Sequence, residues 1–128
     1  MEVQGLADGL QADPPLSPLA VLIQLYEGAI RFLKQSVVAC EEGEVDAFKE
    51  SLERGRRIIE EFQRTLDFSQ GVGVSTQLND LYTFMLENLT QAGLTHDVQY
   101  IQQVVNNLSV LLDGWRSADL GSSTQADG

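Results

Sequence analysis

The sequence predicts an all-α protein that folds as an antiparallel up-down four-helix bundle. All three prolines lie at or before Pro18, so every later residue is free to be helical. Within the rest of the chain, apolar residues recur every three or four positions, and no segment shows the alternation of a β-strand. Glycines divide this part into four long segments, at Gly43, at Gly71 and Gly73, at Gly93, and at Gly121.

The first helix is predicted to begin at Ser17 and Pro18. A serine side chain can accept a hydrogen bond from a free first-turn N–H, and proline suits the first helical position. Gly43 can take the left-handed conformation that ends a helix. The main apolar stripe comprises Leu22, Tyr26, Ala29, Ile30, Leu33, Val37 and Cys40, and a second stripe comprises Val21, Leu25 and Phe32. An apolar surface this wide predicts neighbours on both sides of the helix.

The second helix is predicted over about residues 45–66. Its stripe comprises Phe48, Leu52, Gly55, Ile59, Phe62 and Leu66. Gly55 costs about 1 kcal/mol relative to alanine, and it would let a neighbouring helix approach closely. The opposite face is charged, and its i,i+4 spacing predicts the ion pairs Glu50–Arg54, Glu53–Arg57 and Arg57–Glu61.

The third helix is predicted from Val74 or Ser75 to about Ala92, with the stripe Leu78, Leu81, Tyr82, Met85, Leu89 and Ala92. The fourth begins at Thr95 or His96, where His96 caps the helix or lies on the surface. Its stripe comprises Val98, Ile101, Val104, Val105, Leu108, Leu111, Leu112 and Trp115. The small, polar end of the chain is expected to be disordered. The predicted organisation is a flexible segment 1–16, a bundle domain 17–117 and a disordered tail 118–128.

The composition argues against several classes of function. Eight basic side chains against nineteen acidic ones give a net charge of −11, which disfavours nucleic acid and anionic membrane surfaces. The single cysteine, Cys40, excludes an internal disulfide, and the single histidine excludes a di-iron site of the usual bundle type. No apolar run is long enough to span a membrane, and the first residues do not resemble a signal peptide. We expect a cytoplasmic protein without cofactor, metal or catalytic site.

Several apolar residues lie off the main stripes. Val21, Leu25 and Phe32 of the first helix belong to this group, with Phe84 and Leu86 of the third. Two interpretations stay open. A tightly packed bundle could bury these side chains in its core, or they could line a groove that accepts amphipathic helices from another chain.

The N-terminal segment carries a weaker pattern. Val3, Leu6 and Leu10 have the i, i+3, i+7 spacing of one helix face. They could form a short extra helix that folds over an empty groove as a displaceable cap. Gly5 and Gly9 weaken that helix, and simple disorder is the alternative.

Residues 17–33, SPLAVLIQLYEGAIRFL, resemble the opening helix of the flagellin-specific export chaperones, the FliS family. Later positions match that family in order and spacing: Glu42-Gly43-Glu44-Val45, Leu66-Asp67, Leu78, Leu81-Tyr82, Met85, His96-Asp97-Val98 and Trp115. The resemblance therefore runs from Ser17 to Trp115.

This resemblance implies a function without catalysis. Chaperones of the family are cytoplasmic bundles that bind the disordered C-terminal segment of flagellin in apolar grooves. They prevent premature polymerisation and deliver flagellin to the flagellar type III export apparatus. The partners implied are one flagellin chain and the cytoplasmic domain of the export gate. The groove residues expected here are Val21, Leu25, Phe32, Tyr82 and Phe84, whereas Tyr26 and Trp115 are assigned to the core.

Two departures from the family pattern bear on these expectations. The loop Gly71-Val72-Gly73 replaces the usual Gly-Gly-Glu, and Phe84 replaces a tyrosine. Residues 1–16 contain no aromatic residue, although family members often dock to the export gate through a tyrosine there. Docking is therefore weaker, uses other residues or is absent. Two other functions stay open: a self-associating homodimer, and a regulatory protein with a non-flagellin partner such as an anti-sigma factor or a co-chaperone.

Overall fold

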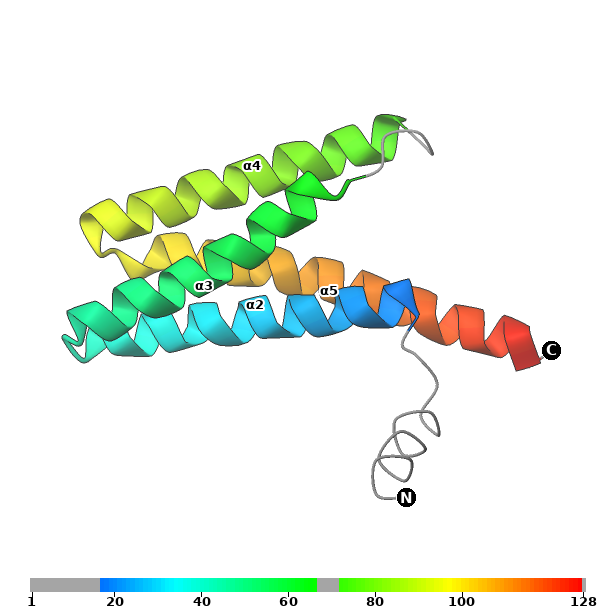
Figure 1. The fold of residues 1–128 in the computed structure, drawn as a ribbon, viewed down its shortest axis with the longest axis horizontal. Coiled ribbons are helices and arrows are strands. Elements are labelled where there is room, and N and C mark those ends of the chain that lie inside the picture. Colours follow the sequence, from blue (N-terminus) through cyan, green and yellow to red (C-terminus); the bar gives the residue numbers. More distant parts are fainter. Residues whose placement is uncertain (1–16, 67–71, 128) are drawn as a thin grey trace, which may run out of the picture.

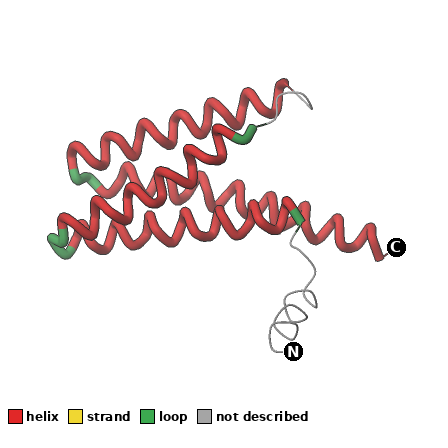
Figure 2. Tube along the Cα trace, viewed as in Figure 1, coloured by secondary structure: helices red, strands yellow, loops and turns green. Residues whose placement is uncertain are grey.

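A computed structural model describes residues 17–66 and 72–127. In this part of the chain, four α-helices and no strand are present (Figures 1 and 2). The helices are α2 (Pro18–Glu41), α3 (Val45–Arg64), α4 (Val72–Thr95) and α5 (Val98–Asp127). The all-α fold class predicted from the sequence is confirmed. The proposed cap residues Val3, Leu6 and Leu10 lie outside the described residues.

Each helix packs against the next one in sequence, and α5 closes the ring by packing against α2. Figure 1 shows α3 running obliquely from the end of α2 to the start of α4. An ion pair joins the first and the last of the described helices, because Arg116 of α5 contacts Glu27 of α2 with an N–O distance of 2.6 Å. The arrangement is the predicted bundle, with short connections between antiparallel neighbours.

The ends of α2 follow the sequence signals. The Ser17 hydroxyl accepts a hydrogen bond from the Ala20 N–H at 3.0 Å, with Pro18 at the first helical position. Gly43 follows the helix with φ 76°, a conformation that glycine adopts without steric cost. The N-cap and the stop signal are therefore confirmed.

The start of α5 differs from the prediction. His96 is exposed, which agrees with the predicted surface position, but it is not helical. It lies between α4 and α5 with φ 58°, and its ring packs edge-on against Phe48 at 5.0 Å. Its carbonyl oxygen accepts a hydrogen bond from the Cys40 thiol at 3.4 Å. The Asp97 carboxylate caps α5 instead, accepting from the Gln99 N–H at 3.0 Å. A short carboxylate is the better N-cap, so the helix begins after Asp97.

The other helix ends also differ. Helix α4 begins at Val72, before the predicted Val74 or Ser75, and α5 continues through Gly114 and Gly121 to Asp127. The predicted tail from residue 118 is thus helical as far as Asp127. A glycine weakens a helix by about 1 kcal/mol but keeps its backbone N–H, so without a proline the hydrogen-bond ladder can continue.

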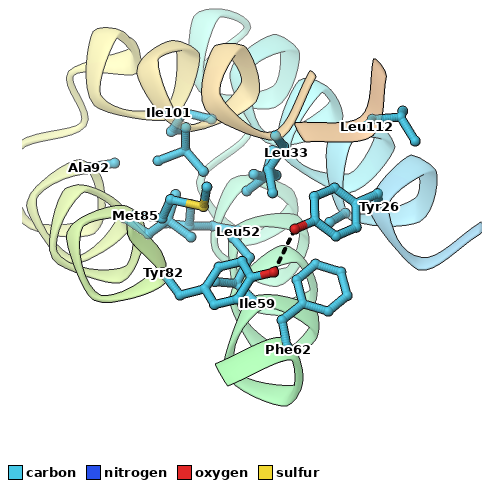
Figure 3. Close-up of a cluster of buried hydrophobic side chains, with 14 of the residues drawn as sticks. Tyr26, Leu33, Leu52, Ile59, Phe62, Tyr82, Met85, Ala92, Ile101 and Leu112 are labelled. Atoms are coloured by element: carbon cyan, nitrogen blue, oxygen red, sulfur yellow. Dashed lines mark hydrogen bonds between the residues drawn. The ribbon is translucent and has the colours of Figure 1, made fainter. Parts of the chain in front are cut away.

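The buried hydrophobic core comes from the predicted main stripes, with Ala39 as the one addition among the residues that the structure describes. It includes Tyr26, Leu33, Leu52, Ile59, Phe62, Tyr82, Met85, Ala92, Ile101 and Leu112 (Figure 3). Trp115 is partly buried against this core and meets Tyr26 edge-on, with 6.3 Å between ring centres. The assignment of Tyr26 and Trp115 to the core agrees with these contacts.

Helix α3 approaches α2 closely at Gly55. A Cβ atom added there would lie 2.5 Å from Cδ2 and 2.8 Å from Cγ of Leu33, which is fully buried. Such distances are far below van der Waals contact. The close approach predicted from this glycine is therefore confirmed.

Candidate functional site

A cavity of about 610 Å³ lies between α2 and α3, near the turn that joins them. Its apolar lining comes from Ile30, Val38, Ala39 and Ala47. Charged and polar side chains complete the wall: Glu27, Arg31, Lys34, Gln35, Glu42, Glu44 and Ser51. A pocket lined by both apolar and polar side chains fits an amphipathic segment.

A second cavity, of about 480 Å³, lies on the other side of α2, against α5. Val37 and Val38 contribute from α2, with Gln102, Val105 and Asn106 from α5. Lys34 and Val38 line both cavities. We call the two cavities the α2 grooves, and Val38, whose exposed fraction is 51%, is the apolar residue of the wall that they share.

The α2 grooves were not predicted from the sequence. Val38 belongs to neither apolar stripe of the first helix, so its position along the chain did not single it out. The signal that could have found it is that the residues one helical turn before and after Val38, Lys34 and Glu42, are charged, so that an apolar side chain stands on a polar face. Such a residue lines a groove only where a second helix forms the opposite wall.

The five predicted groove residues differ in how far the structure exposes them. Val21, Leu25 and Phe84 are exposed, and Phe32 is half-buried. The Phe32 ring lies 5.5 Å from the Arg31 guanidinium carbon and 5.7 Å from that of Arg54. None of these four residues lines the α2 grooves, and Phe84 lines a separate cavity between α4 and α5.

Tyr82 is a core residue, with an exposed fraction of 2%. Its position on the main stripe of α4, beside Met85, carries it inward, so it does not line a groove as predicted. Its hydroxyl forms a buried hydrogen bond of 2.6 Å with the Tyr26 hydroxyl (Figure 3). Phe62 lies against both rings, with centre-to-centre distances of 4.5 Å to Tyr26 and 5.6 Å to Tyr82. Burial raises the pKa of both tyrosine hydroxyls, which favours their neutral forms.

Replacing Tyr82 by phenylalanine should lower the free energy of unfolding by about 1–3 kcal/mol, because the buried Tyr26 hydroxyl then loses its partner. Replacing both tyrosines should cost less than the sum of the two single changes, since no hydroxyl is left unpaired. Urea unfolding of the wild type, both single variants and the double variant measures this coupling. Additive effects would contradict a shared hydrogen bond.

The charged face of α3 is explained largely by local pairing. Arg54 pairs with Glu50 at 2.7 Å and Arg57 with Glu53 at 3.3 Å, as predicted. The predicted pair of Arg57 with Glu61 is replaced, because Glu61 contacts Arg64 one turn later. These pairs are exposed and contribute little to stability.

The part of the chain that the structure describes offers neither a metal site nor a membrane span. No group of three His, Cys, Asp or Glu side chains is placed to hold a metal ion there. None of the helices described is both long and apolar enough to cross a membrane.

Comparison with known proteins identifies the family. The model of the family described as "Flagellar protein FliS" matches residues 14–122. The chain is 32% identical over 110 residues to the flagellar secretion chaperone FliS of Salmonella typhimurium, covering 85% of this chain and 82% of that protein. It is also 32% identical over 100 residues to the flagellar secretion chaperone FliS of Campylobacter jejuni, covering 78% of each.

A solved structure supports the fold. The crystal structure of a bacterial flagellar chaperone matches with a TM-score of 0.77 and 24% identity, covering 94% of this chain and 99% of that one. The family match covers most of the chain, and the two relatives exceed 30% identity over most of their length. The chain therefore belongs to the FliS family of flagellar secretion chaperones, which are not enzymes.

Proposed function

We propose that this chain acts in the cytoplasm as an export chaperone for flagellin. It binds the disordered C-terminal segment of flagellin, which we call the client, and lays apolar parts of it into the α2 grooves. Binding prevents premature polymerisation of flagellin, and the complex is delivered to the flagellar type III export apparatus. The observation that carries this proposal is the pair of apolar grooves that share Val38.

The free energy gained by burying a few apolar side chains is large enough to offset the cost of ordering the client. A client that folds on binding must offset about 2–5 kcal/mol or more of ordering cost. Three or four apolar side chains, at about 1.5–3 kcal/mol each when fully buried, exceed that cost. Two grooves on either side of one helix offer room for these contacts without any catalytic group. The net charge of −11 disfavours self-association of the free chaperone.

The test is isothermal titration calorimetry with a client peptide taken from the flagellin of the same organism. A peptide of about 40 residues is long enough to bury the 1,000–3,000 Å² typical of coupled folding and binding. We expect one peptide per chain, sub-micromolar affinity, a negative heat-capacity change and a gain of helical circular dichroism. The matched control is the same peptide with its apolar residues replaced by serine, which should not bind.

A folded protein that ignores the client peptide would contradict the proposal. Sedimentation of that protein would then distinguish a homodimer from a monomer with another partner, such as an anti-sigma factor or a co-chaperone. Docking to the export gate requires a separate titration of the preformed complex with the cytoplasmic domain of the gate.

A further inference from the structure

The seam between α3 and α4 contains a cavity that shares no lining residue with the α2 grooves. Helix α4 packs against α3 and α5 but not against α2. The cavity has a volume of about 320 Å³, at the lower end of the range for ligand sites, so it suits one anchoring side chain rather than a whole ligand. Its lining comprises Lys49, Leu52, Glu53 and Arg56 of α3, with Leu89, Thr90, Gly93 and Leu94 of α4. A partner in this seam would leave the α2 grooves open.

The seam offers apolar surface to a partner. Leu94 is 75% exposed, more than any other large hydrophobic residue that the structure describes. Gly93, one residue before it, has no side chain to fill the cavity. A Cβ atom added to Gly93 would have its nearest neighbour, Cδ2 of Leu52, at 3.7 Å. The missing side chain therefore leaves space beside an exposed leucine.

The positive charge of the protein is concentrated on α3. This helix carries five of the eight basic side chains and five of the nineteen acidic ones, so it is neutral in a chain of net charge −11. In the seam, Glu53 is the one carboxylate that lines the cavity with Lys49 and Arg56. Glu53 lies 3.8 Å from Arg56 and also pairs with Arg57 at 3.3 Å. The cavity lining therefore keeps a net positive charge.

Both cations of the seam can still bind a carboxylate. Nη2 of Arg56 donates a hydrogen bond to the Thr90 hydroxyl at 2.9 Å, and that hydroxyl donates to the Leu86 carbonyl at 3.1 Å. These bonds hold the guanidinium across the seam, with its side chain only 22% exposed. A guanidinium has five N–H donors, so one hydrogen bond leaves others for a partner. Lys49 is exposed and forms no ion pair among the described residues.

We propose that the α3–α4 seam binds an acidic amphipathic helix of a protein other than the client. One apolar side chain of that helix enters the cavity beside Gly93 and contacts Leu94, while flanking carboxylates pair with Arg56 and Lys49. Docking of a helix into a groove suits a seam between two helices. An acidic partner is repelled by the rest of this acidic chain, so its charge directs it to α3. Such binding does not require the proposed function of the α2 grooves.

Other occupants match the seam less well. A nucleic acid would find only two cations there, in a chain of net charge −11. A purely apolar helix would cover Arg56 and Lys49 without supplying a counter-charge. A small anion would gain nothing from the exposed Leu94. An acidic helix with one apolar anchor uses both the cations and the apolar surface.

The test uses a synthetic probe, a helical peptide of about 18 residues with leucines at i, i+3 and i+7 and glutamates beside them. Nuclear magnetic resonance of the isotope-labelled full chain locates the binding site and gives the affinity. We expect the shifted amide signals to cluster around Arg56, Thr90 and Leu94. Raising the salt concentration from about 0.05 to about 0.5 M should weaken binding. The same peptide with glutamine in place of glutamate should bind at least about tenfold more weakly.

Three variants separate charge from shape. Arg56→Gln should weaken probe binding about tenfold and Lys49→Gln about two- to fivefold, because the arginine is better shielded from water. Gly93→Leu fills the cavity and should weaken binding at least about tenfold. The thermal midpoint of free Gly93→Leu should stay the same or rise, since its Cβ has room and glycine is a poor helix former. The matched control is Arg64→Gln, which removes the same charge from α3 but lines neither this cavity nor the α2 grooves, and it should bind the probe like the wild type.

Failure of the seam proposal is distinguishable from failure of the proposed function. A folded chain that does not bind the probe, or that binds it equally well in Arg56→Gln and Arg64→Gln, would show that the seam proposal is wrong, whether or not the client binds. Displacement of the probe by a saturating client peptide would also overturn it, because the seam would then belong to the client. Equal probe affinity with and without bound client would support two separate sites.

Discussion

Replacing Val38 by aspartate should weaken client binding by about 100-fold, while the free chain keeps its fold. Val38 is the apolar residue of the wall that both α2 grooves share, so one substitution affects both. Loss of its apolar contact and burial of a carboxylate together cost about 3 kcal/mol. The valine is already half exposed, so the free protein should tolerate the charge. Calorimetry with the client peptide measures affinity, and circular dichroism reports the fold.

The matched control is Val110→Asp. Val110 is 71% exposed on α5 and lines neither α2 groove. The Val110→Asp variant should therefore bind the client with the affinity of the wild type. A third variant, Leu25→Asp, tests the surface predicted from the sequence. If Leu25→Asp weakens binding more than Val38→Asp does, the client uses the other side of α2 and the assignment of the α2 grooves is wrong.

Replacing Gly55 by alanine should lower the free energy of unfolding by about 1–3 kcal/mol, although alanine is the better helix former by about 1 kcal/mol. The added methyl group would lie 2.5 Å from Cδ2 of Leu33, which has no exposed surface. Helices α2 and α3 must therefore separate, or Leu33 must leave its rotamer. The midpoint of urea unfolding measures the effect.

Gly28 provides the matched control within the same pair of helices. A Cβ atom there would have its nearest neighbours at 3.8 Å, an ordinary contact. Gly28→Ala should therefore stabilise the protein by up to about 1 kcal/mol. The double variant Gly55→Ala/Leu33→Ala should be more stable than the sum of its single changes, because the new methyl group enters the space that leucine vacates. A Gly55→Ala variant as stable as Gly28→Ala would show that this helix crossing relaxes freely.

Much of the fold was determined by the sequence alone. An apolar stripe predicts which residues of a helix face inward. The four stripes account for the core around Tyr26, Phe48 and Met85. The Ser17 cap and the Gly43 stop are local signals that depend only on neighbouring residues. Gly55 predicted a close contact between two helices, because a missing side chain on an apolar stripe leaves space for another helix. The family could also be inferred, because its motifs are arrangements along the chain.

The location of the candidate site was decided by tertiary structure. A stripe fixes the direction of a side chain relative to its own helix axis, but not what lies in that direction. The packing of the helices buries Tyr82 against Tyr26 and leaves Val21 and Leu25 exposed. Val38 became part of a groove only because α3 and α5 supply walls on either side of it.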